Sequence, residues 1–184
     1  MSAAHSATEI IEFWFSERVR NLWFNSTPAF DNEIRERFEV LYQQAKAGGL
    51  DAWRRDADGA LALCILLDQF PLNMYRGQPA AFATEAAARD VAKSAIDVGL
   101  DQTLGADEKA FFYLPFMHSE DMNDQNYSVS LYQRAGMMEH LRYAQHHRDI
   151  VLRFGRFPHR NAMLNRVSTP QELAYLASPE GFKG

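Results

Sequence analysis

A single cysteine and the lack of any long apolar run are the first constraints that the sequence sets. One cysteine excludes an internal disulfide bond. It lies within the apolar residues 61–67, so we interpret Cys64 as a small buried hydrophobe rather than a nucleophile. No apolar run approaches the roughly 20 residues of a membrane span, and the N-terminus lacks the basic region and apolar core of a secretion signal. We therefore expect a cytoplasmic protein with no membrane partner.

Strand patterns and nucleotide-binding loops are also lacking. Apolar and polar residues do not alternate, and valine and isoleucine are sparse, which argues against a sheet. The sequence contains no glycine-rich phosphate loop and no dinucleotide fingerprint. We predict an all-α protein without a cofactor. Short turns between helices of this length favour antiparallel helix pairs.

Negative charge prevails overall but is unevenly distributed. The net charge of -5 does not favour nucleic-acid binding. Residues 142–166 nevertheless hold six arginines and one acid, a local charge of +5, which leaves about -10 for the remainder. This distribution suggests internal acids, a small anion or an acidic peptide as the partner of the basic segment. The length of 184 residues and the hydrophobic share of 47% suit one domain, residues 1–184.

Periodicity and capping residues divide the chain into about eight helices. One helix starts at Thr27-Pro28 and ends before Gly48-Gly49. Asp58 is predicted to cap the next helix, whose residues 60–67 are apolar on every side and therefore central. Ser119 is a plausible cap as well. The other predicted helices cover residues 8–15, 80–98, 106–118, about 120–135, about 138–154, and a short terminal helix after Ser168-Thr169-Pro170 with Glu172 in its first turn.

Residues 153–161 combine three arginines, a histidine and an asparagine with two phenylalanines, broken by Gly155 and Pro158. Solvated loops rarely hold so much aromatic mass, and cores rarely hold so much positive charge. Such a segment is either held by buried acceptors or binds an anionic ligand.

Polar side chains also interrupt the apolar faces of several predicted helices. His147 lies on the apolar face of the last long helix, and Gln125 shares a face with apolar neighbours on the helix before it. Asp68 continues the stripe of the central helix. A buried carboxylate without a partner costs several kcal/mol, so a buried Asp68 needs a cation or several hydrogen-bond donors. The candidates are Arg76, Arg156 and Arg160, because a guanidinium binds a carboxylate at two points.

We predict that these groups converge on one site. The candidates for moving a proton are His118, Glu120, His147 and His159, and the candidates for ligand binding are Asp68, Asn73, Arg76, Gln125, Arg153, Arg156, Arg160 and Asn161. A purely structural network of the same residues is the alternative, since buried arginine–carboxylate networks often pin helix ends.

Three specific chemistries fit the sequence poorly. A metal site from His118 and Glu120 is disfavoured, because residues two apart do not share a helix face and nearby arginines repel a cation. We therefore predict no metal. Ser119 lacks a nucleophile-elbow context. The Arg153-to-His159 spacing is similar to the ribonuclease motif of HEPN helical domains, but that motif requires an unbroken helix.

Four motifs together resemble the bacterial family called domain of unknown function 924. They are Leu67-Asp-Gln-Phe-Pro-x-Asn-x-x-Arg76, Tyr113-Leu-Pro-Phe-x-His-Ser-Glu120 with Gln125, His147-Arg-Asp-Ile and the segment 153–161. The resemblance extends from Phe13 to Phe182. It implies a tetratricopeptide-like, right-handed helical superhelix, although no 34-residue tetratricopeptide consensus occurs. It implies no reaction. Leu72 replaces the family's usual arginine, and Asn165 its usual glycine, which suggests a left-handed turn at Asn165.

Two functions follow as hypotheses. The first is binding of a small carboxylate or phosphate, or acid–base catalysis on such a ligand, by the arginine, histidine and carboxylate cluster. The second is a helical scaffold that binds a protein or peptide, with the polar cluster purely structural. The oligomeric state is not predicted.

Overall fold

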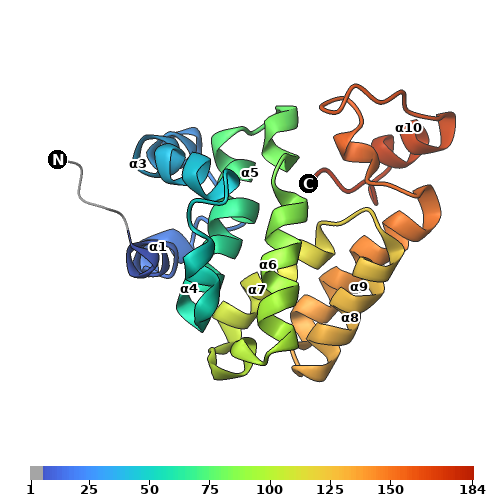
Figure 1. Ribbon diagram of the computed structural model, residues 1–184. Coiled ribbons are helices and arrows are strands. Elements are labelled where there is room, and N and C mark those ends of the chain that lie inside the picture. Colours follow the sequence, from blue (N-terminus) through green and yellow to red (C-terminus); the bar gives the residue numbers. More distant parts are fainter. Residues whose placement is uncertain (1–5) are drawn as a thin grey trace. The chain divides into compact units, whose positions relative to one another are not determined.

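The computed structural model describes residues 6–184, which form helices and turns with no strand. The predicted all-α class is confirmed, and eight helices of eight or more residues match the expected number. The α-helices are α1 (Ala7–Trp14), α2 (Glu17–Arg20), α3 (Pro28–Lys46), α4 (Ala57–Cys64), α5 (Phe70–Met74), α6 (Glu85–Asp97), α7 (Ala106–Met117), α8 (Met122–Arg134), α9 (Met138–Phe154) and α10 (Pro170–Ala177) (Figure 1).

The chain divides into two compact units. Of the described residues, the first comprises 6–76 and 80–115, and the second comprises 77–79 and 116–184. The boundary falls within α7, which has Pro115 in its interior. The single domain and the superhelix both stay predictions, because each concerns how the two units are joined.

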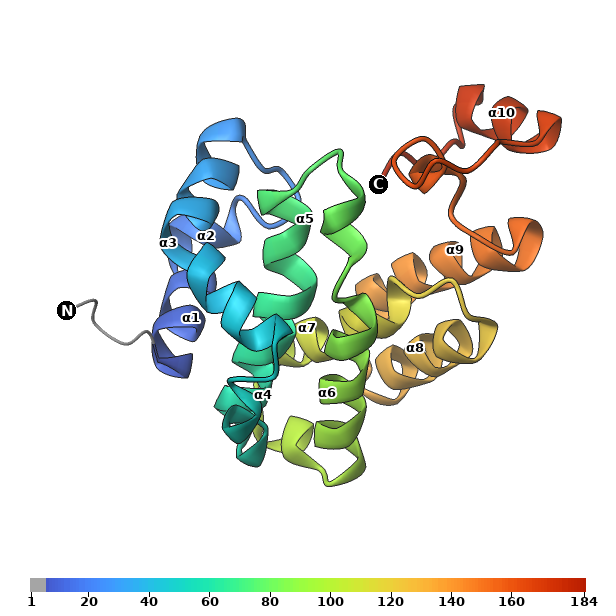
Figure 2. The same ribbon diagram turned by 45° about the horizontal axis from the view of Figure 1, so that its top comes forward.

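The first unit is built around α4, which packs on α1 and α6, while α3 packs on α5 (Figures 1 and 2). Residues 60–67 are all buried, as their uniformly apolar sequence predicted. Large aromatic side chains of this unit pack edge to face, for example Trp14 of α1 with Phe70 of α5 and with Phe111 of α7. The N-cap of α4 is Asp56, whose carboxylate accepts the Gly59 N–H, so the predicted cap at Asp58 was wrong by two residues.

A π-helical turn, η2 (Ile65–Gln69), joins α4 to α5. Such turns shift the helical register and leave carbonyl groups in need of other donors. Thr84 supplies one, because its hydroxyl donates to the Leu67 carbonyl at 2.6 Å. The turn contains Asp68, which is only 2% exposed.

The second unit is built on the neighbouring pair α8 and α9, which Gly136 joins in a left-handed turn (Figures 1 and 2). Gly155 ends α9 with φ of 70° and redirects the chain into residues 156–161. Asp121, not the predicted Ser119, caps α8 by accepting the Asn123 and Asp124 N–H groups. A small apolar core holds this unit together and consists of Ile150, Val151, Phe157 and Tyr175, with Met122, Phe154, Leu176 and Phe182 packed against it.

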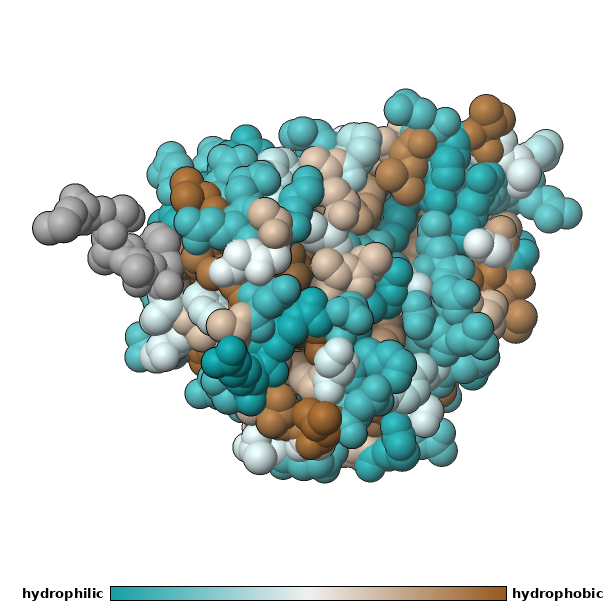
Figure 3. All heavy atoms as spheres, viewed as in Figure 1, coloured by the Kyte–Doolittle hydropathy of each residue, from teal (hydrophilic) through white to brown (hydrophobic). Residues whose placement is uncertain are grey.

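Hydrophilic side chains cover most of the face seen in Figure 3, and the apolar side chains there form small separate groups. The exposed large apolar residues, such as Phe24 and Val167, are scattered along the sequence. None of the helices between residues 6 and 184 combines the length and the apolar character that a membrane crossing requires. The cytoplasmic location stays a prediction.

Candidate functional site

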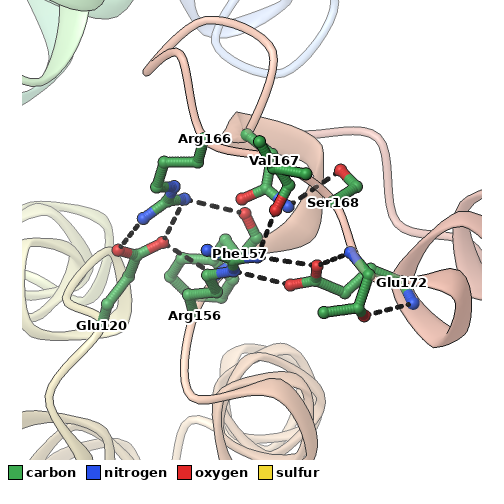
Figure 4. Close-up of polar contacts among 9 residues, drawn as sticks. Glu120, Arg156, Phe157, Arg166, Val167, Ser168 and Glu172 are labelled. Atoms are coloured by element: carbon green, nitrogen blue, oxygen red, sulfur yellow. Dashed lines mark hydrogen bonds and ion pairs between the residues drawn. The ribbon is translucent and has the colours of Figure 1, made fainter.

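Glu120 and Arg166 form a two-point ion pair in the second unit (Figure 4), with nitrogen–oxygen distances of 2.7 and 2.9 Å. Glu120 also accepts the backbone N–H of Phe157 at 2.7 Å. Burial alone would raise the pKa of Glu120, but the Arg166 guanidinium and the Phe157 N–H hold it below its ordinary value. Glu120 is therefore ionised at neutral pH. It anchors the basic segment by accepting hydrogen bonds from Arg166 and from the Phe157 backbone.

A second two-point pair joins Arg156 to Glu172 in the first turn of α10 (Figure 4). The nitrogen–oxygen distances are 2.6 and 2.8 Å, and Arg156 also donates to the Val167 carbonyl. Glu172 takes part in a capping box with Thr169, as its position after Thr-Pro predicted. The Arg156 guanidinium and the Thr169 N–H lower the pKa of Glu172 to about 2, so this nearly inaccessible carboxylate stays charged.

A cavity of about 320 Å³ adjoins the second pair. Its lining comes from the end of α9, the chain that follows it and the start of α10, and consists of Arg153, Phe154, Arg156, Thr169, Gln171 and Glu172. The Arg153 guanidinium lies over the rings of Phe154 and Tyr175, at 4.8 and 5.6 Å from their centroids. Arg153 has no carboxylate partner among residues 6–184, so it supplies this cavity with an uncompensated positive charge.

Two uncharged imidazoles, those of His147 and His159, each contact the ring of Phe157. Burial is the main cause that lowers the pKa of His147 to about 3 and that of His159 to about 4. Nδ1 of His147 lies 2.8 Å from the carbonyl oxygen of Tyr143. A carbonyl oxygen can only accept, so the proton of His147 is on Nδ1 and Nε2 keeps the lone pair. The predicted need of His147 for a partner is thus met within its own helix.

The other predicted residues of this unit have structural partners. Gln125 is fully buried and donates from Nε2 to the carbonyl oxygens of Met117 and Ser119. Asn161 is also buried and donates from Nδ2 to the Ser168 hydroxyl. Arg160 is 6% exposed, and its guanidinium lies 4.8 Å from the centroid of the Phe157 ring. His118 is half-buried just after the end of α7, where it lies close enough to His147 and His159 to disfavour their protonation.

Three predicted residues lie in the first unit. Asn73 and Arg76 converge on Asp31, which also accepts a hydrogen bond from Ser26. Burial opposes ionisation of Asp31, but these donors, with Arg76 foremost, lower its pKa below the ordinary value. Arg76 therefore pairs with Asp31 and not with Asp68, for which it had been a candidate. Asp68 accepts from the Gln69 side chain at 2.5 Å.

Among residues 6–184, no group of three or more histidine, cysteine, aspartate or glutamate side chains is arranged to hold a metal ion. His118, His146 and His159 nevertheless lie close enough to His147 to disfavour its protonation.

The family model described as "Bacterial protein of unknown function (DUF924)" matches residues 10–180. The chain belongs to this family. A solved structure of a protein of unknown function from Agrobacterium tumefaciens is 44% identical to it and superposes with a TM-score of 0.88. That similarity covers 93% of this chain and 96% of the other. No curated protein matches the chain.

Within this DUF924 protein, the second unit contains nine of the twelve predicted site residues and the first unit contains three. That both groups form one site stays a prediction. Sequence reasoning missed four partners: Asp31, Arg166, Glu172 and Phe182. Glu172 was predicted only as an acid in the first turn of the terminal helix. Asp31 carried no signal beyond being an acid in a first helical turn, and Arg166 belonged to the recognised basic segment without a role. The aromatic character of Phe182 marked it only as a candidate for packing.

Proposed function

We propose that this protein binds a small anionic ligand, a carboxylate or a phosphate, in the cavity between the end of α9 and the first turn of α10. The observation that carries the proposal is the uncompensated Arg153 at a cavity also lined by Arg156. Arg153 and Arg156 contribute two positive charges, and Glu172 contributes one negative charge, so the lining keeps a net charge of about +1.

Hydrogen-bond donors support the same assignment. Arg156 uses Nε and Nη2 for Glu172 and Val167, which leaves the Nη1 amino group for a ligand. The first turn of a helix also carries N–H groups that have no partner within the helix. In α10 the capping box uses those of Thr169 and Glu172, and residue 170 is proline, which leaves the N–H of Gln171. Its position at a helix N-terminus favours an anion.

Binding is better supported than acid–base catalysis. A general base works best when its pKa lies near the working pH. The pKa of about 3 for His147 and of about 4 for His159 makes both imidazoles weak bases at neutral pH. Glu120 and Glu172 are held as carboxylates by their arginines, so neither is a proton donor at that pH.

Titration with inorganic phosphate and with succinate, at constant ionic strength, tests the proposal. We expect saturable binding of at least one anion to the wild type. Arg153→Ala should weaken that binding by about tenfold or more. Arg142→Ala is the matched control, because Arg142 is exposed on the same helix and its loss changes the net charge equally. Failure of both anions to bind the wild type, or equal losses in the two variants, overturns the proposal.

The competing function is a scaffold for a protein or an acidic peptide. Such a partner would be held over a broad surface rather than in one cavity. A scaffold therefore predicts no response to either small anion, together with saturable binding of an acidic peptide that Arg142→Ala and Arg153→Ala weaken alike.

A further inference from the structure

Three imidazoles surround the ring of Phe182. The ring centroids of His147, His159 and His146 lie 4.8, 5.0 and 5.7 Å from that of Phe182, each in an edge-to-face arrangement. Phe157 contacts His147 and His159 from the core side. The two inner imidazoles thus lie between two phenyl rings, one from the core and one from residues 181–184.

The segment that carries Phe182 is held by few polar contacts. The Phe182 N–H donates to the Tyr175 hydroxyl at 3.1 Å. Before it, Gly181 lies against the end of α10, where a Cβ atom would come within 2.6 Å of the Tyr175 carbonyl oxygen. Gly181 therefore lets the chain turn back closely over α10. The Phe182 ring then contacts the imidazoles, and Gly184 also lies close to the His159 ring.

The imidazoles keep polar atoms that a phenyl ring does not satisfy. Nδ1 of His159 is buried and has no hydrogen-bond partner among residues 6–184. Nε2 of His147 keeps a lone pair, because Nδ1 donates to the Tyr143 carbonyl. A buried polar atom without a partner costs about 1–3 kcal/mol, so a ligand that offered Nδ1 of His159 a hydrogen-bond partner would gain what Phe182 lacks.

We propose that Phe182 occupies a binding site for a planar aromatic ligand that carries a hydrogen-bond donor, such as an indole or a phenol. The flat rings of His146, His147 and His159, which now contact Phe182, select an aromatic group. The lone pair of His147 selects a donor on that group. The guanidinium of Arg160, which acts on His159, disfavours a cationic ligand. This site does not depend on the anion cavity at Arg153.

Displacement of Phe182 is required before the ligand binds. The apparent affinity of the wild type is therefore reduced by the fraction of molecules in which the site is open. Phe182→Ala removes this competitor. Because Phe182 packs at the edge of the small core, this variant loses some stability and its folding must be checked by circular dichroism.

Calorimetric titration with indole and with 1-methylindole tests the site, because the two probes differ in the N–H donor. Indole should bind Phe182→Ala about tenfold or more tightly than the wild type. It should also bind that variant more tightly than 1-methylindole does. Adding His147→Phe should abolish the preference for indole and leave the 1-methylindole affinity unchanged. Equal binding of the two probes to Phe182→Ala, or no binding of indole to it, overturns the proposal.

A second measurement avoids the risk that Phe182→Ala does not fold. 4-Fluorophenylalanine at position 182 reports on the ring in an otherwise unchanged protein. Saturating indole should shift its fluorine signal to that of a solvent-exposed ring. If the fluorine signal does not move at saturating indole, the Phe182 ring is not displaced. This result overturns the proposal whether or not indole binds elsewhere.

Discussion

The side-chain amide of Gln125 lies 2.6 Å from the carbonyl oxygen of Ser119, and it also donates to Met117 at 2.7 Å. One fully buried NH₂ group thus satisfies two carbonyl oxygens beyond the end of α7. Gln125→Glu replaces this donor with an acceptor of similar shape. We expect the free energy of unfolding to fall by about 3 kcal/mol, because an ionised or protonated carboxyl group cannot serve both oxygens.

Urea unfolding of Gln125→Glu and of Gln133→Glu measures this effect. Gln133 is exposed on the same helix, so the same change there should alter the free energy of unfolding by no more than about 0.5 kcal/mol. Equal losses in the two variants would show that the effect comes from the added charge and not from the lost donor.

The sequence was informative where the determining interactions are local. Thr27-Pro28 and Thr169-Pro170 marked the starts of α3 and α10 correctly, because a cap and its helix are neighbours in sequence. The cap of α8 was misplaced because Ser119 and Asp121 both suit that role. Ser119 instead accepts the Asp121 N–H and donates to Asp124.

Partner choice within the site could not be predicted in the same way. Glu120 and Arg166 are 46 residues apart, and several arginines of the basic segment suited that carboxylate equally well. The pairing is decided by the turn after Gly155, which directs the Phe157 N–H to the same carboxylate. Residue types therefore indicated a charged cluster, while the backbone path selected the pairs.

Glu120→Gln tests how much the Arg166 pair stabilises the second unit. We expect a loss of about 1–2 kcal/mol at pH 7, since the pair is partly solvated and the Phe157 N–H keeps an acceptor. The folded-state pKa of Glu120 lies below its ordinary value of 4.5. Its stabilisation is therefore complete above that pH and is lost as the pH falls through the folded-state pKa.

Unfolding of the wild type and of Glu120→Gln at pH 7 and at pH 3 measures the difference. The difference in the free energy of unfolding between the two proteins should be smaller at pH 3 than at pH 7. Glu139→Gln is the control, because Glu139 is exposed in the first turn of α9. If the difference in the free energy of unfolding between the wild type and Glu120→Gln stays constant with pH, the Glu120 carboxylate contributes by its shape and not by its charge.

The partly buried imidazole of His147 predicts a second loss of stability at low pH, which arises from a base that resists protonation and not from an acid that becomes protonated. Its pKa is about 3 in the folded protein and 6.5 ordinarily, so below pH 6.5 the unfolded chain takes up a proton that the folded protein does not. The stability that depends on neutral His147 is therefore fully present above pH 6.5 and decreases as the pH falls towards 3. At pH 4 we expect His147 to lower the free energy of unfolding by roughly 2–3 kcal/mol relative to pH 7.

His147→Phe should remove this part of the pH dependence, because phenylalanine does not titrate. At pH 7 the variant should be less stable than the wild type, since phenylalanine is larger and the Tyr143 carbonyl loses its donor. Gln145→Phe places the same ring at an exposed neighbouring position and should keep the wild-type pH dependence. If the free energy of unfolding of His147→Phe decreases between pH 7 and pH 4 as much as that of the wild type, the pH dependence comes from other groups.

Asn165 adopts φ of 52°, which confirms the left-handed turn that its place in the family pattern suggested. Asparagine tolerates this conformation better than most residues, whereas a Cβ-branched side chain is strained there. Asn165→Val should therefore lower the free energy of unfolding by about 1–2 kcal/mol. Asn165→Gly should leave it within about 0.5 kcal/mol, because glycine gains backbone freedom here but also loses more of it on folding. Equal effects of the two substitutions in thermal unfolding would contradict a backbone origin and point to the lost side-chain amide.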